Sequence, residues 1–305
     1  MRARILITGA RGQLGQTFQE IAPAFPSLDL VFAGRQELDI TDTRAIEAFF
    51  GTHELHAVIN AAAYTAVDRA ETEAEQALAV NVTAVYELAR VTARMGLPFV
   101  HYSSDYVYHN DLNRPLRETD PTSPRGVYAR TKLKGEQMAR QAHPGCTIIR
   151  TSWVYSRYGH NFLNTMLRLG RARDELGVVY DQVGAPTWTR DLAEATLRIL
   201  EAHFAGRLSA QRMAGVFNYA NDGVTSWYDF AKAIFRLAGL DCRVRPITSD
   251  EYPTPAPRPH YSLMHKGRFR KAFGLDIPHW HDSLRRCIQQ MGVLADPCDQ
   301  RLSAD

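Results

Sequence analysis

Tyr128 and Lys132 are four positions apart in the segment Tyr-Ala-Arg-Thr-Lys, near the start of a helical pattern that runs through residue 138. On a helix this spacing places both side chains on one face. A phenol with a pKa of about 10 is a poor acid or base at neutral pH, and a nearby ammonium group would lower that pKa. The pair could therefore protonate a carbonyl oxygen while hydride reaches the carbon. The same spacing also occurs by chance, on surface helices where the tyrosine is only partly packed.

Ser104 is the third candidate for this chemistry, and it follows a predicted strand over residues 99–103. A hydroxyl at that strand end could hold a substrate carbonyl oxygen beside Tyr128. Otherwise Ser103 and Ser104 would merely cap the strand. A glycine loop upstream and the Tyr/Lys pair downstream, in that order and on those elements, favour the catalytic interpretation.

Three glycines, Gly9, Gly12 and Gly15, lie in the segment Thr-Gly-Ala-Arg-Gly-Gln-Leu-Gly between an apolar strand and an amphipathic helix. Glycines permit a tight turn and close approach of the backbone to a pyrophosphate, and the helix N-terminus adds partial positive charge. The GxxGxxG pattern is weak evidence by itself, but its position after a strand and before a helix is the required context. The loop predicts dinucleotide binding.

Arg35 follows the second predicted strand, where a carboxylate would commonly bind the adenosine ribose and select NAD. A guanidinium can instead pair with the 2′-phosphate of NADP and stack on adenine. A solvated loop arginine is an equally good interpretation of the residue type alone. The third strand ends in Asn-Ala-Ala-Ala over residues 60–63, whose small side chains would let a cofactor lie against the strand ends.

The elements that must position these residues alternate between strand and helix patterns in the first half of the chain. Strands are predicted at 4–8, 28–33, 57–61, 99–103 and 146–154, and helices at 13–21, at 75–95 and through residue 138. This alternation predicts an α/β fold with a Rossmann-type doubly wound parallel sheet, and residues 1–150 as an NAD(P)-binding domain.

The second half is less regular, with strands predicted at 178–180 and 216–219 and helices at 191–203 and 226–237. Four prolines make residues 252–259 an extended loop, and the chain after residue 291 is expected to be frayed. We expect residues 151–305 to form mainly a smaller C-terminal substrate-binding domain, with elements from about 178–220 returning to the first domain.

Composition narrows the class of protein. The 305 residues carry a net charge of only +3, without the clustered basic stripe of a nucleic-acid-binding protein. No run approaches the ~18 apolar residues of a membrane helix, and the N-terminal apolar run is too short for a signal peptide. The four cysteines form no CxxC pair, so neither zinc nor a disulfide framework is indicated. We expect a cytoplasmic protein with reduced thiols.

Taken together, the motifs resemble those of the extended short-chain dehydrogenase/reductases, and more narrowly those of the dTDP-4-dehydrorhamnose reductase family. The resemblance covers nearly the whole chain, and its most specific parts are Arg-Thr-Ser-Trp-Val-Tyr at 150–155, Asp-Gln-Val-Gly-Ala-Pro-Thr at 181–187 and Tyr-Pro-Thr-Pro-Ala-Pro-Arg-Pro at 252–259. It implies reduction of dTDP-4-dehydro-L-rhamnose to dTDP-L-rhamnose, the last step of dTDP-rhamnose biosynthesis, for lipopolysaccharide or cell-wall polysaccharide. The implied cofactor is NADPH, with NADH as an alternative.

The resemblance also implies roles for matching positions. Gly12, Gln13 and Leu14 would contact the pyrophosphate; Asp39 and Ile40 would flank adenine; Ala63, Tyr64 and Thr65 would line the cofactor; Tyr128 and Lys132 would contact nicotinamide and ribose; Ser104, Asp105, Tyr106 and Trp153 would surround the sugar. Two departures stand out. The family more often has threonine at position 104, and after Arg258-Pro259 this chain reads His-Tyr-Ser-Leu-Met where the usual run is closer to xNSRL.

Some members of that family dimerise through magnesium held by acidic side chains. At two of the corresponding positions this chain has Thr17 and Arg190, while Glu194 keeps acidic character at a third. Threonine and arginine cannot serve a hard cation as carboxylates do. We therefore predict that no metal is required, and that the protein is a monomer or weak dimer without a magnesium bridge.

Three alternative functions compete with the reductase: the residues speak against the first and the third, and leave the second open. A nucleotide-sugar dehydratase of this type would carry Asp-Glu after the hydroxyl residue, where this chain has Asp105-Tyr106. An epimerase would retain its cofactor tightly through turnover, which the sequence does not address. A non-catalytic regulatory subunit could keep the fold and bind NADP, because fold alone does not prove activity.

Overall fold

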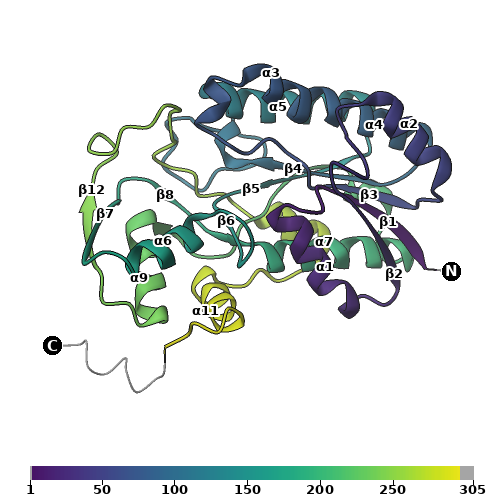
Figure 1. The fold of residues 1–305 in the computed structure, drawn as a ribbon. Coiled ribbons are helices and arrows are strands. Elements are labelled where there is room, and N and C mark those ends of the chain that lie inside the picture. The colour runs from purple at the N-terminus through teal and green to yellow at the C-terminus, as the bar shows by residue number, and fades with distance from the viewer. Residues whose placement is uncertain (1, 296–305) are drawn as a thin grey trace.

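A six-stranded parallel sheet forms the centre of the protein (Figure 1). The computed structural model describes residues 2–295. In spatial order the strands are β2 (Leu28–Ala33), β1 (Ala3–Thr8), β3 (Ala57–Asn60), β4 (Phe99–Ser104), β5 (Thr147–Thr151) and β10 (Gly215–Asn218). All neighbouring pairs are parallel. The predicted Rossmann-type α/β fold is confirmed.

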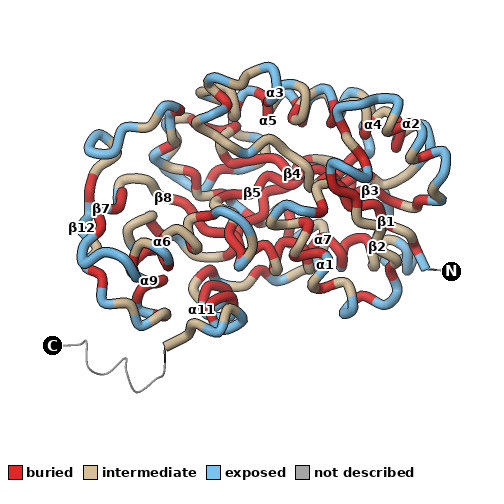
Figure 2. The backbone as a smooth tube through the Cα atoms, in the orientation of Figure 1, coloured by how far each residue is buried: buried red, intermediate tan, exposed pale blue. Residues whose placement is uncertain are grey.

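The sheet is buried on both faces, as Figure 2 shows by its red central strands. Within β1, Ile5 and Ile7 belong to one hydrophobic cluster, whereas Leu6 belongs to another on the opposite face. Successive side chains of a strand point to opposite faces, so a continuous apolar run fits a sheet covered on both sides. This is why the strand reads as an uninterrupted apolar segment.

Helices cover the two faces. One face carries α2 (Thr43–Thr52), α3 (Ala74–Leu78), α4 (Ala84–Arg94) and α5 (Gly126–Ala142), and the other carries α1 (Gln13–Ile21) and α7 (Thr189–Phe204). The helix predicted at 75–95 consists of α3 and α4 joined by a π-helical turn, Ala79–Thr83. Helix α2 was not predicted. Its start is set by Asp42, whose carboxylate accepts hydrogen bonds from the backbone of Arg44 and Ala45.

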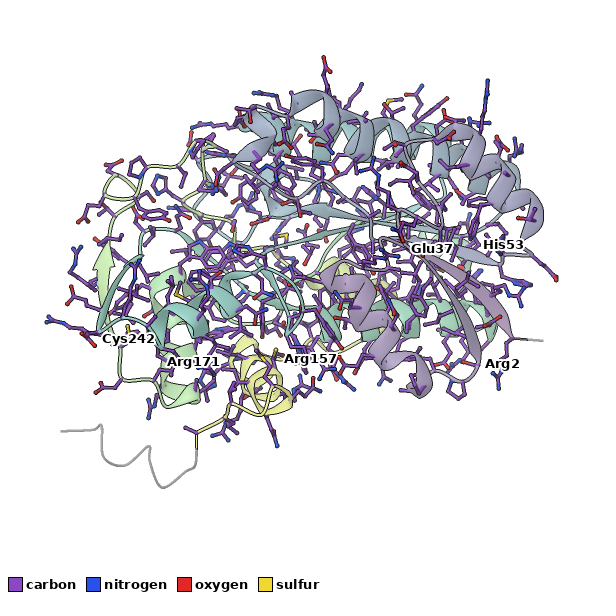
Figure 3. All side chains as sticks on the ribbon, in the orientation of Figure 1. Arg2, Glu37, His53, Arg157, Arg171 and Cys242 are labelled. Atoms are coloured by element: carbon purple, nitrogen blue, oxygen red, sulfur yellow. The ribbon has the colours of Figure 1, made fainter. Side chains whose placement is uncertain are left out.

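A smaller lobe lies beyond the β5 side of the sheet (Figure 1). Its core is built on α6 (Phe162–Gly170), α9 (Trp227–Ala238) and α11 (Trp280–Gln290), with β7 (Glu175–Val179) paired in parallel with β12 (Arg243–Ile247). The remaining elements are β6 (Val154–Tyr155), β8 (Val183–Gly184), β9 (Thr187–Trp188), β11 (Thr225–Ser226), α8 (Ala210–Met213), α10 (Gly267–Phe273) and short 3-10 turns at Ala22–Ala24, Arg69–Glu71 and Asp105–Val107. Figure 3 shows Arg171 and Cys242 in this lobe, at the opposite end of the molecule from Arg2 and His53.

The second half of the chain differs in detail from its sequence pattern. The strand expected over 146–154 is interrupted, because Trp153 has a φ of 47° and separates β5 from β6. The segment predicted at 216–219 joins the central sheet as β10, whereas the one at 178–180 overlaps β7, which pairs with β12. The expected fraying after residue 291 falls partly on residues 296–305, which lie outside the described residues.

Two further observations concern the predicted class of protein. None of the helices within residues 2–295 is both long and apolar enough to cross a membrane. Cys146, Cys242 and Cys287 are free thiols, and all three are buried. Cys298 lies outside the described residues.

Candidate active site

The loop after β1 is shaped by glycine. Gly9 has a φ of 67°, and a Cβ there would lie 2.6 Å from the backbone nitrogen of Ala62, just beyond β3. A Cβ on Gly15 would collide with the carbonyl oxygen of Gly9. Glycine therefore lets this loop lie against both the end of β3 and the first turn of α1. Because β2 and β3 flank β1 on opposite sides, the loop stands at the switch point where open α/β sheets bind ligands.

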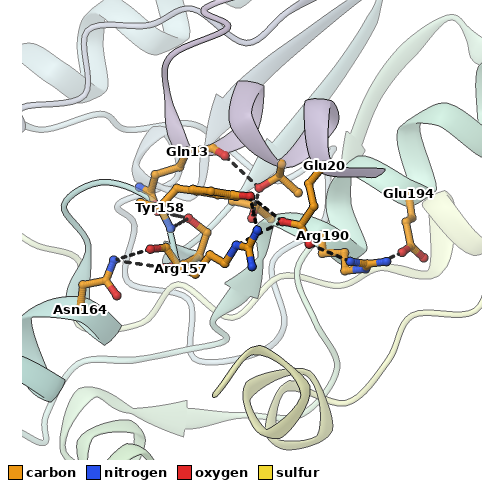
Figure 4. A network of polar contacts seen from close by, with 10 residues as sticks. Gln13, Glu20, Arg157, Tyr158, Asn164, Arg190 and Glu194 are labelled. Carbon is orange, nitrogen blue, oxygen red and sulfur yellow. Dashed lines mark hydrogen bonds and ion pairs between the residues drawn. The ribbon is translucent and has the colours of Figure 1, made fainter. Parts of the chain in front are cut away.

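The N-terminus of α1 suits an anion. Gly12 is its N-cap and supplies no side chain to cap the helix, and the first turn has no acidic residue. The Gln13 side chain is turned away, accepting hydrogen bonds from Ser156 (3.1 Å) and Asn161 (2.9 Å) (Figure 4). Leu14 packs against the hydrophobic core. The backbone of this turn, rather than those side chains, is thus what a pyrophosphate would meet.

Beyond the end of β2 lie two guanidinium groups. Arg35 is 77% exposed and donates a 3.1 Å hydrogen bond to Asp39, while Arg11 lies 3.2 Å from Glu37. Hydrogen bonds from Thr41 lower the pKa of Asp39, so this carboxylate is ionised at neutral pH. Both guanidinium groups could reach a phosphate at this end of a dinucleotide, and both already have an acidic partner.

The loop after β3 is held by a residue that the motifs did not single out. Asn81, buried in the π-helical turn, accepts a hydrogen bond from the Tyr64 backbone nitrogen (2.9 Å) and donates one to the Tyr64 carbonyl (3.0 Å). Ala63 and Thr65 flank that clamped residue. Ile40, predicted to lie beside adenine, is buried in the core cluster under α2. The sequence offered one signal for this role of Asn81: it is a single asparagine between two valines in a predicted helix.

Lys132 is buried with only 3% of its surface exposed, and its Nζ donates a 2.7 Å hydrogen bond to the carbonyl oxygen of Tyr102 in β4. Burial lowers the pKa of Lys132 to about 8, although the carboxylate of Glu136 one turn later opposes that shift. Glu136 is itself paired with Arg150 at 2.7 Å. The ammonium group is therefore fixed by its surroundings.

Tyr128 lies one turn before Lys132, on the same helix, α5. Burial raises the pKa of Tyr128 to about 12, while the adjacent Ser104 hydroxyl acts in the opposite direction. The ring of Tyr106 meets that of Tyr128 edge-on, with centroids 5.6 Å apart. We expected the lysine to lower this pKa, but in this structure the phenol stays protonated at neutral pH. A protonated phenol is the form that can donate a proton.

Ser104 ends β4 and is 5% exposed. Its hydroxyl donates to Asp105 Oδ1 (3.0 Å) and accepts from the Tyr106 backbone nitrogen (3.2 Å). Burial raises the pKa of Asp105 to about 6, opposed by the hydroxyls of Ser262 and Ser104. Oδ2 of Asp105 is buried and lacks a hydrogen-bond partner among the described residues. An unpaired buried carboxyl oxygen is costly, so this atom is a candidate contact for a ligand.

The start of α5 is fixed from outside the helix. Arg125 at the N-cap contributes no side-chain hydrogen bond, and Gly126 has a φ of 80°. Glu71 supplies the missing acceptor, because its Oε1 accepts from the Val127 backbone nitrogen at 2.6 Å. A loop following β3 thereby positions the turn that carries Tyr128.

Trp153 has the only positive φ of a non-glycine residue within residues 2–295. Such a conformation costs ~1–3 kcal/mol and persists where the surroundings impose it. Its ring stacks on Trp227 with centroids 3.7 Å apart and planes 11° apart. A Cβ on Gly184 would lie 3.0 Å from the Trp153 ring and 2.8 Å from the Ser262 hydroxyl. Trp153 and Ser262 thus both lie beside Gly184, and the hydroxyl of Ser262 also acts on Asp105.

The proline-rich loop is tied to the Rossmann side. Asp68 accepts hydrogen bonds from Arg258 at 2.8 Å and from the Ala256 backbone nitrogen at 3.2 Å. The charges of Arg258 and Asp68 both act on Tyr106, whose pKa is raised by burial. The structure therefore brings the loop at 252–259 close to Tyr106, one of the predicted sugar-binding residues, although the two lie far apart in the sequence.

Thr17, Arg190 and Glu194, the positions that correspond to magnesium ligands in some family members, form hydrogen bonds or ion pairs with other residues of this chain. The buried Thr17 hydroxyl lies 2.7 Å from that of Thr189. Arg190 donates to Glu20 at 3.0 Å and to Glu194 at 2.9 Å (Figure 4). Across residues 2–295, no group of three or more His, Cys, Asp or Glu side chains is arranged to hold a metal ion.

Comparison with known proteins identifies the family. The family model described as RmlD substrate binding domain matches residues 3–293. The chain belongs to this family. It is 41% identical over 291 residues to a dTDP-4-dehydrorhamnose reductase of Mycobacterium tuberculosis (strain ATCC 25618 / H37Rv), covering 93% of this chain and 92% of that protein. It is 36% identical to the spore coat polysaccharide biosynthesis protein SpsK of Bacillus subtilis (strain 168), covering 96% and 99%.

A solved structure agrees with this placement in the RmlD family. The dTDP-4-dehydrorhamnose reductase of Bacillus anthracis str. Ames, in complex with NADP, superposes with a TM-score of 0.88 at 34% identity, covering 95% of this chain and all (100%) of that one. The family resemblance predicted from the motifs is confirmed.

Proposed function

We propose that this protein is an NADPH-dependent reductase that converts dTDP-4-dehydro-L-rhamnose to dTDP-L-rhamnose, the last step of dTDP-rhamnose synthesis. The observation that carries the reaction type is the protonated phenol of Tyr128 beside the Ser104 hydroxyl, at the same sheet edge as the glycine loop. The names of the family relatives support the choice of sugar nucleotide.

The residues of the predicted cofactor site fit a dinucleotide. The glycine loop and the uncapped first turn of α1, over Gly12, Gln13 and Leu14, would hold the pyrophosphate through backbone N–H groups. Arg35 would pair with a 2′-phosphate, which favours NADPH. The adenine would lie by Asp39 and Ile40, and the rest of the cofactor along residues 63–65. Bound NADPH supplies hydride to C4 of the sugar.

Tyr128 protonates the C4 oxygen in this proposal, and the single hydroxyl proton of Ser104 turns from Asp105 Oδ1 to donate a second hydrogen bond to the same oxygen. A phenol with a pKa of about 12 stays protonated until the oxygen gains charge, which suits an acid that acts in the transition state. Lys132, anchored on Tyr102, places a cation one turn away that would stabilise the phenolate left behind. Solvent then reprotonates Tyr128.

The sugar would be held by Asp105, Tyr106 and Trp153. Asp105 contributes an unpaired buried oxygen, which a sugar hydroxyl could satisfy. Trp153 presents an indole held in one plane by Trp227. Residues 1–150 would then be the NAD(P)-binding domain, and the later residues mainly the substrate side, with α7 and β10 attached to the sheet.

Two rival functions make different demands on these residues. A 4,6-dehydratase needs a base at position 106, where Tyr106 has a pKa raised by burial and thus keeps its proton. A non-catalytic NADP-binding subunit would not need the Ser104 hydroxyl beside Tyr128, or a buried Lys132 one turn later on the same helix. An epimerase is separated from the reductase only by its use of the cofactor.

The sugar nucleotide is thus the proposed partner, and we further propose that neither nucleic acid nor a bridging magnesium ion takes part. The absence of a bridging magnesium ion is supported by Arg190, because its guanidinium forms ion pairs with the carboxylates of Glu20 and Glu194. We propose a monomer or weak dimer. The cytoplasmic location expected from the sequence stays a prediction.

The test is an assay of purified protein with dTDP-4-dehydrorhamnose and either NADPH or NADH. Stoichiometric cofactor oxidation with formation of dTDP-rhamnose is expected. Turnover without net oxidation of a retained cofactor would indicate an epimerase, and cofactor binding without turnover would indicate a regulatory subunit; either result would overturn the proposal.

A further inference from the structure

Trp153 has a backbone conformation that a bulky side chain disfavours for steric reasons. With a φ of 47° it lies in the left-handed region, which a bulky L-residue adopts only when its neighbours impose it. Its carbonyl accepts a 3.1 Å hydrogen bond from the Thr187 backbone, and the next residue begins β6. The backbone contacts fix the chain on either side, but they leave the plane of the indole to the side-chain contacts.

Trp227 provides the broad contact for that indole. The two rings are stacked, and no other pair of tryptophans within residues 2–295 is in ring contact. Trp227 is itself immobilised: its Nε1 donates to Gln182 at 3.2 Å and Phe162 packs against it at 4.6 Å between centroids. It is the first residue of α9, directly after the N-cap Ser226, so the stack rests on a capped helix.

One edge of the Trp153 ring lies beside Gly184, close to Ser262. Gly184 leaves room for it, since a Cβ there would lie 3.0 Å from the ring and 2.8 Å from Ser262 Oγ. Ser262 in turn faces Asp105, which accepts the hydrogen bond of Ser104. Trp153 is therefore separated from the catalytic Ser104 by two side chains, those of Ser262 and Asp105.

We propose that Trp227 is a positioning residue: it holds the indole of Trp153 in the one plane that receives the sugar nucleotide. This rests on the proposed function, in which Trp153 contacts the sugar. Trp227 lies outside the groups that move protons, so it acts on binding of the sugar nucleotide and leaves binding of the nicotinamide cofactor alone.

The experiment uses Trp227→Leu and Trp227→Phe, with Trp280→Phe as the matched control. Trp280 packs edge-on against Phe230 in the hydrophobic cluster on which Trp227 also packs, and its ring pairs within residues 2–295 do not include Trp153. Stacked indoles couple their transitions, which gives a paired positive and negative band in far-ultraviolet circular dichroism. We expect this band pair in the wild type and in Trp280→Phe, and its loss in Trp227→Leu, Trp227→Phe and Trp153→Phe.

Steady-state kinetics supplies the second readout. Trp227→Leu should raise KM for the keto sugar about tenfold, equivalent to ~1.4 kcal/mol, with kcat and KM for NADPH changed less than about threefold. Trp227→Phe, which keeps an aromatic face, should fall between Trp227→Leu and the wild type. Unchanged KM for the sugar in Trp227→Leu, or an equal rise in Trp280→Phe, would overturn the proposal.

The two proposals fail in different ways. A wild type that does not reduce the keto sugar would overturn the proposed function and, with it, the substrate for this positioning role, while the circular dichroism would still report whether the stack exists. An active wild type without the coupled bands would overturn the positioning role alone. If Trp227→Leu does not fold, Trp227→Phe decides by the same two measurements.

Discussion

The ammonium group of Lys132 donates a 2.7 Å hydrogen bond to the carbonyl oxygen of Tyr102, two residues before Ser104 in the same strand. This contact joins α5 to β4 at the level of the catalytic groups. Tyr128, one turn earlier on α5, is thereby held beside the Ser104 hydroxyl. The Tyr/Lys spacing thus has a structural consequence as well as a chemical one, because the lysine fixes the helix that carries the phenol.

Tyr128→Phe removes the proposed proton donor and leaves the ring. We expect kcat to fall by about 10²–10⁴-fold, the usual contribution of a positioned acid, with NADPH affinity unchanged within about threefold. Single-turnover assays and a cofactor titration would measure the two effects. Tyr86→Phe, on α4 and outside the site, serves as the control and should keep full activity. Near-normal turnover of Tyr128→Phe would contradict the assigned role.

Asp105 should make the protein less stable as the pH rises. Burial raises its pKa from 3.8 to about 6, so the folded protein binds this proton more tightly than the unfolded chain does. Relative to Asp105→Asn, the free energy of unfolding of the wild type should fall between about pH 4 and pH 6. At pH 7 to 8 the variant should be more stable, by at most about 3 kcal/mol.

Urea unfolding of both proteins at pH 4 and pH 7.5 would test this. Asp39→Asn is a control of opposite sign, because hydrogen bonds from Thr41 lower the pKa of Asp39. The wild type should therefore gain stability over Asp39→Asn as the pH rises. Equal pH dependence in the wild type and Asp105→Asn would show that Asp105 is not an uncompensated buried carboxyl.

Gly9→Ala tests the glycine loop. A Cβ at this position would lie 2.6 Å from the Ala62 nitrogen and would sit on a backbone with a φ of 67°. We expect a loss of more than ~1 kcal/mol in unfolding free energy and a sharp loss of cofactor binding. Gly51→Ala is the matched control: it lies in α2 with nothing within 4 Å of its Cβ position, and should gain ~0.5–1 kcal/mol. Thermal unfolding with and without NADPH measures both.

Much of this site follows from local sequence pattern. The strand, glycine loop and helix over residues 3–21 form as their spacing predicts, and so does the helix that places Tyr128 before Lys132. Each of these depends on contacts between near neighbours in the chain, which periodicity records. Helix α2 was missed although Asp42 marks its start and the apolar residues Ile46, Phe49 and Phe50 have helical spacing.

The remaining features depend on contacts between distant segments. The interruption at Trp153 cannot be read from a β-branched, apolar run, since the backbone there is held by a hydrogen bond from Thr187, which is distant in the sequence. The same holds for the hydrogen bond from Val127 to Glu71. Burial also reversed one expectation. Desolvation raises the pKa of Tyr128, and the hydroxyl of Ser104, not the ammonium of Lys132, is the group that opposes it; depth of burial is a tertiary property.

Arg35→Ala should change the choice of cofactor. Arg35 is largely exposed, and Asp39 is its only ion-pair partner within residues 2–295, so its guanidinium is available to a 2′-phosphate. We expect KM for NADPH to rise about tenfold and KM for NADH to stay the same, since NADH lacks that phosphate. Arg44→Ala, an exposed arginine at the start of α2, is the control. If KM for NADPH does not change, Arg35 is only a solvated loop residue, and Arg11→Ala then tests the neighbouring guanidinium.

Arg190 should make the protein indifferent to magnesium. Its guanidinium lies between the carboxylates of Glu20 and Glu194 and neutralises them within one chain. Light scattering should therefore give the same mass in EDTA and in MgCl2, and a dimer that dissociates on chelation would contradict this. Arg190→Glu replaces the cation with a third carboxylate, so its Tm should fall in EDTA through repulsion and recover when magnesium is added. The Tm of the wild type should respond to neither, because the arginine already supplies the charge that the ion would bring.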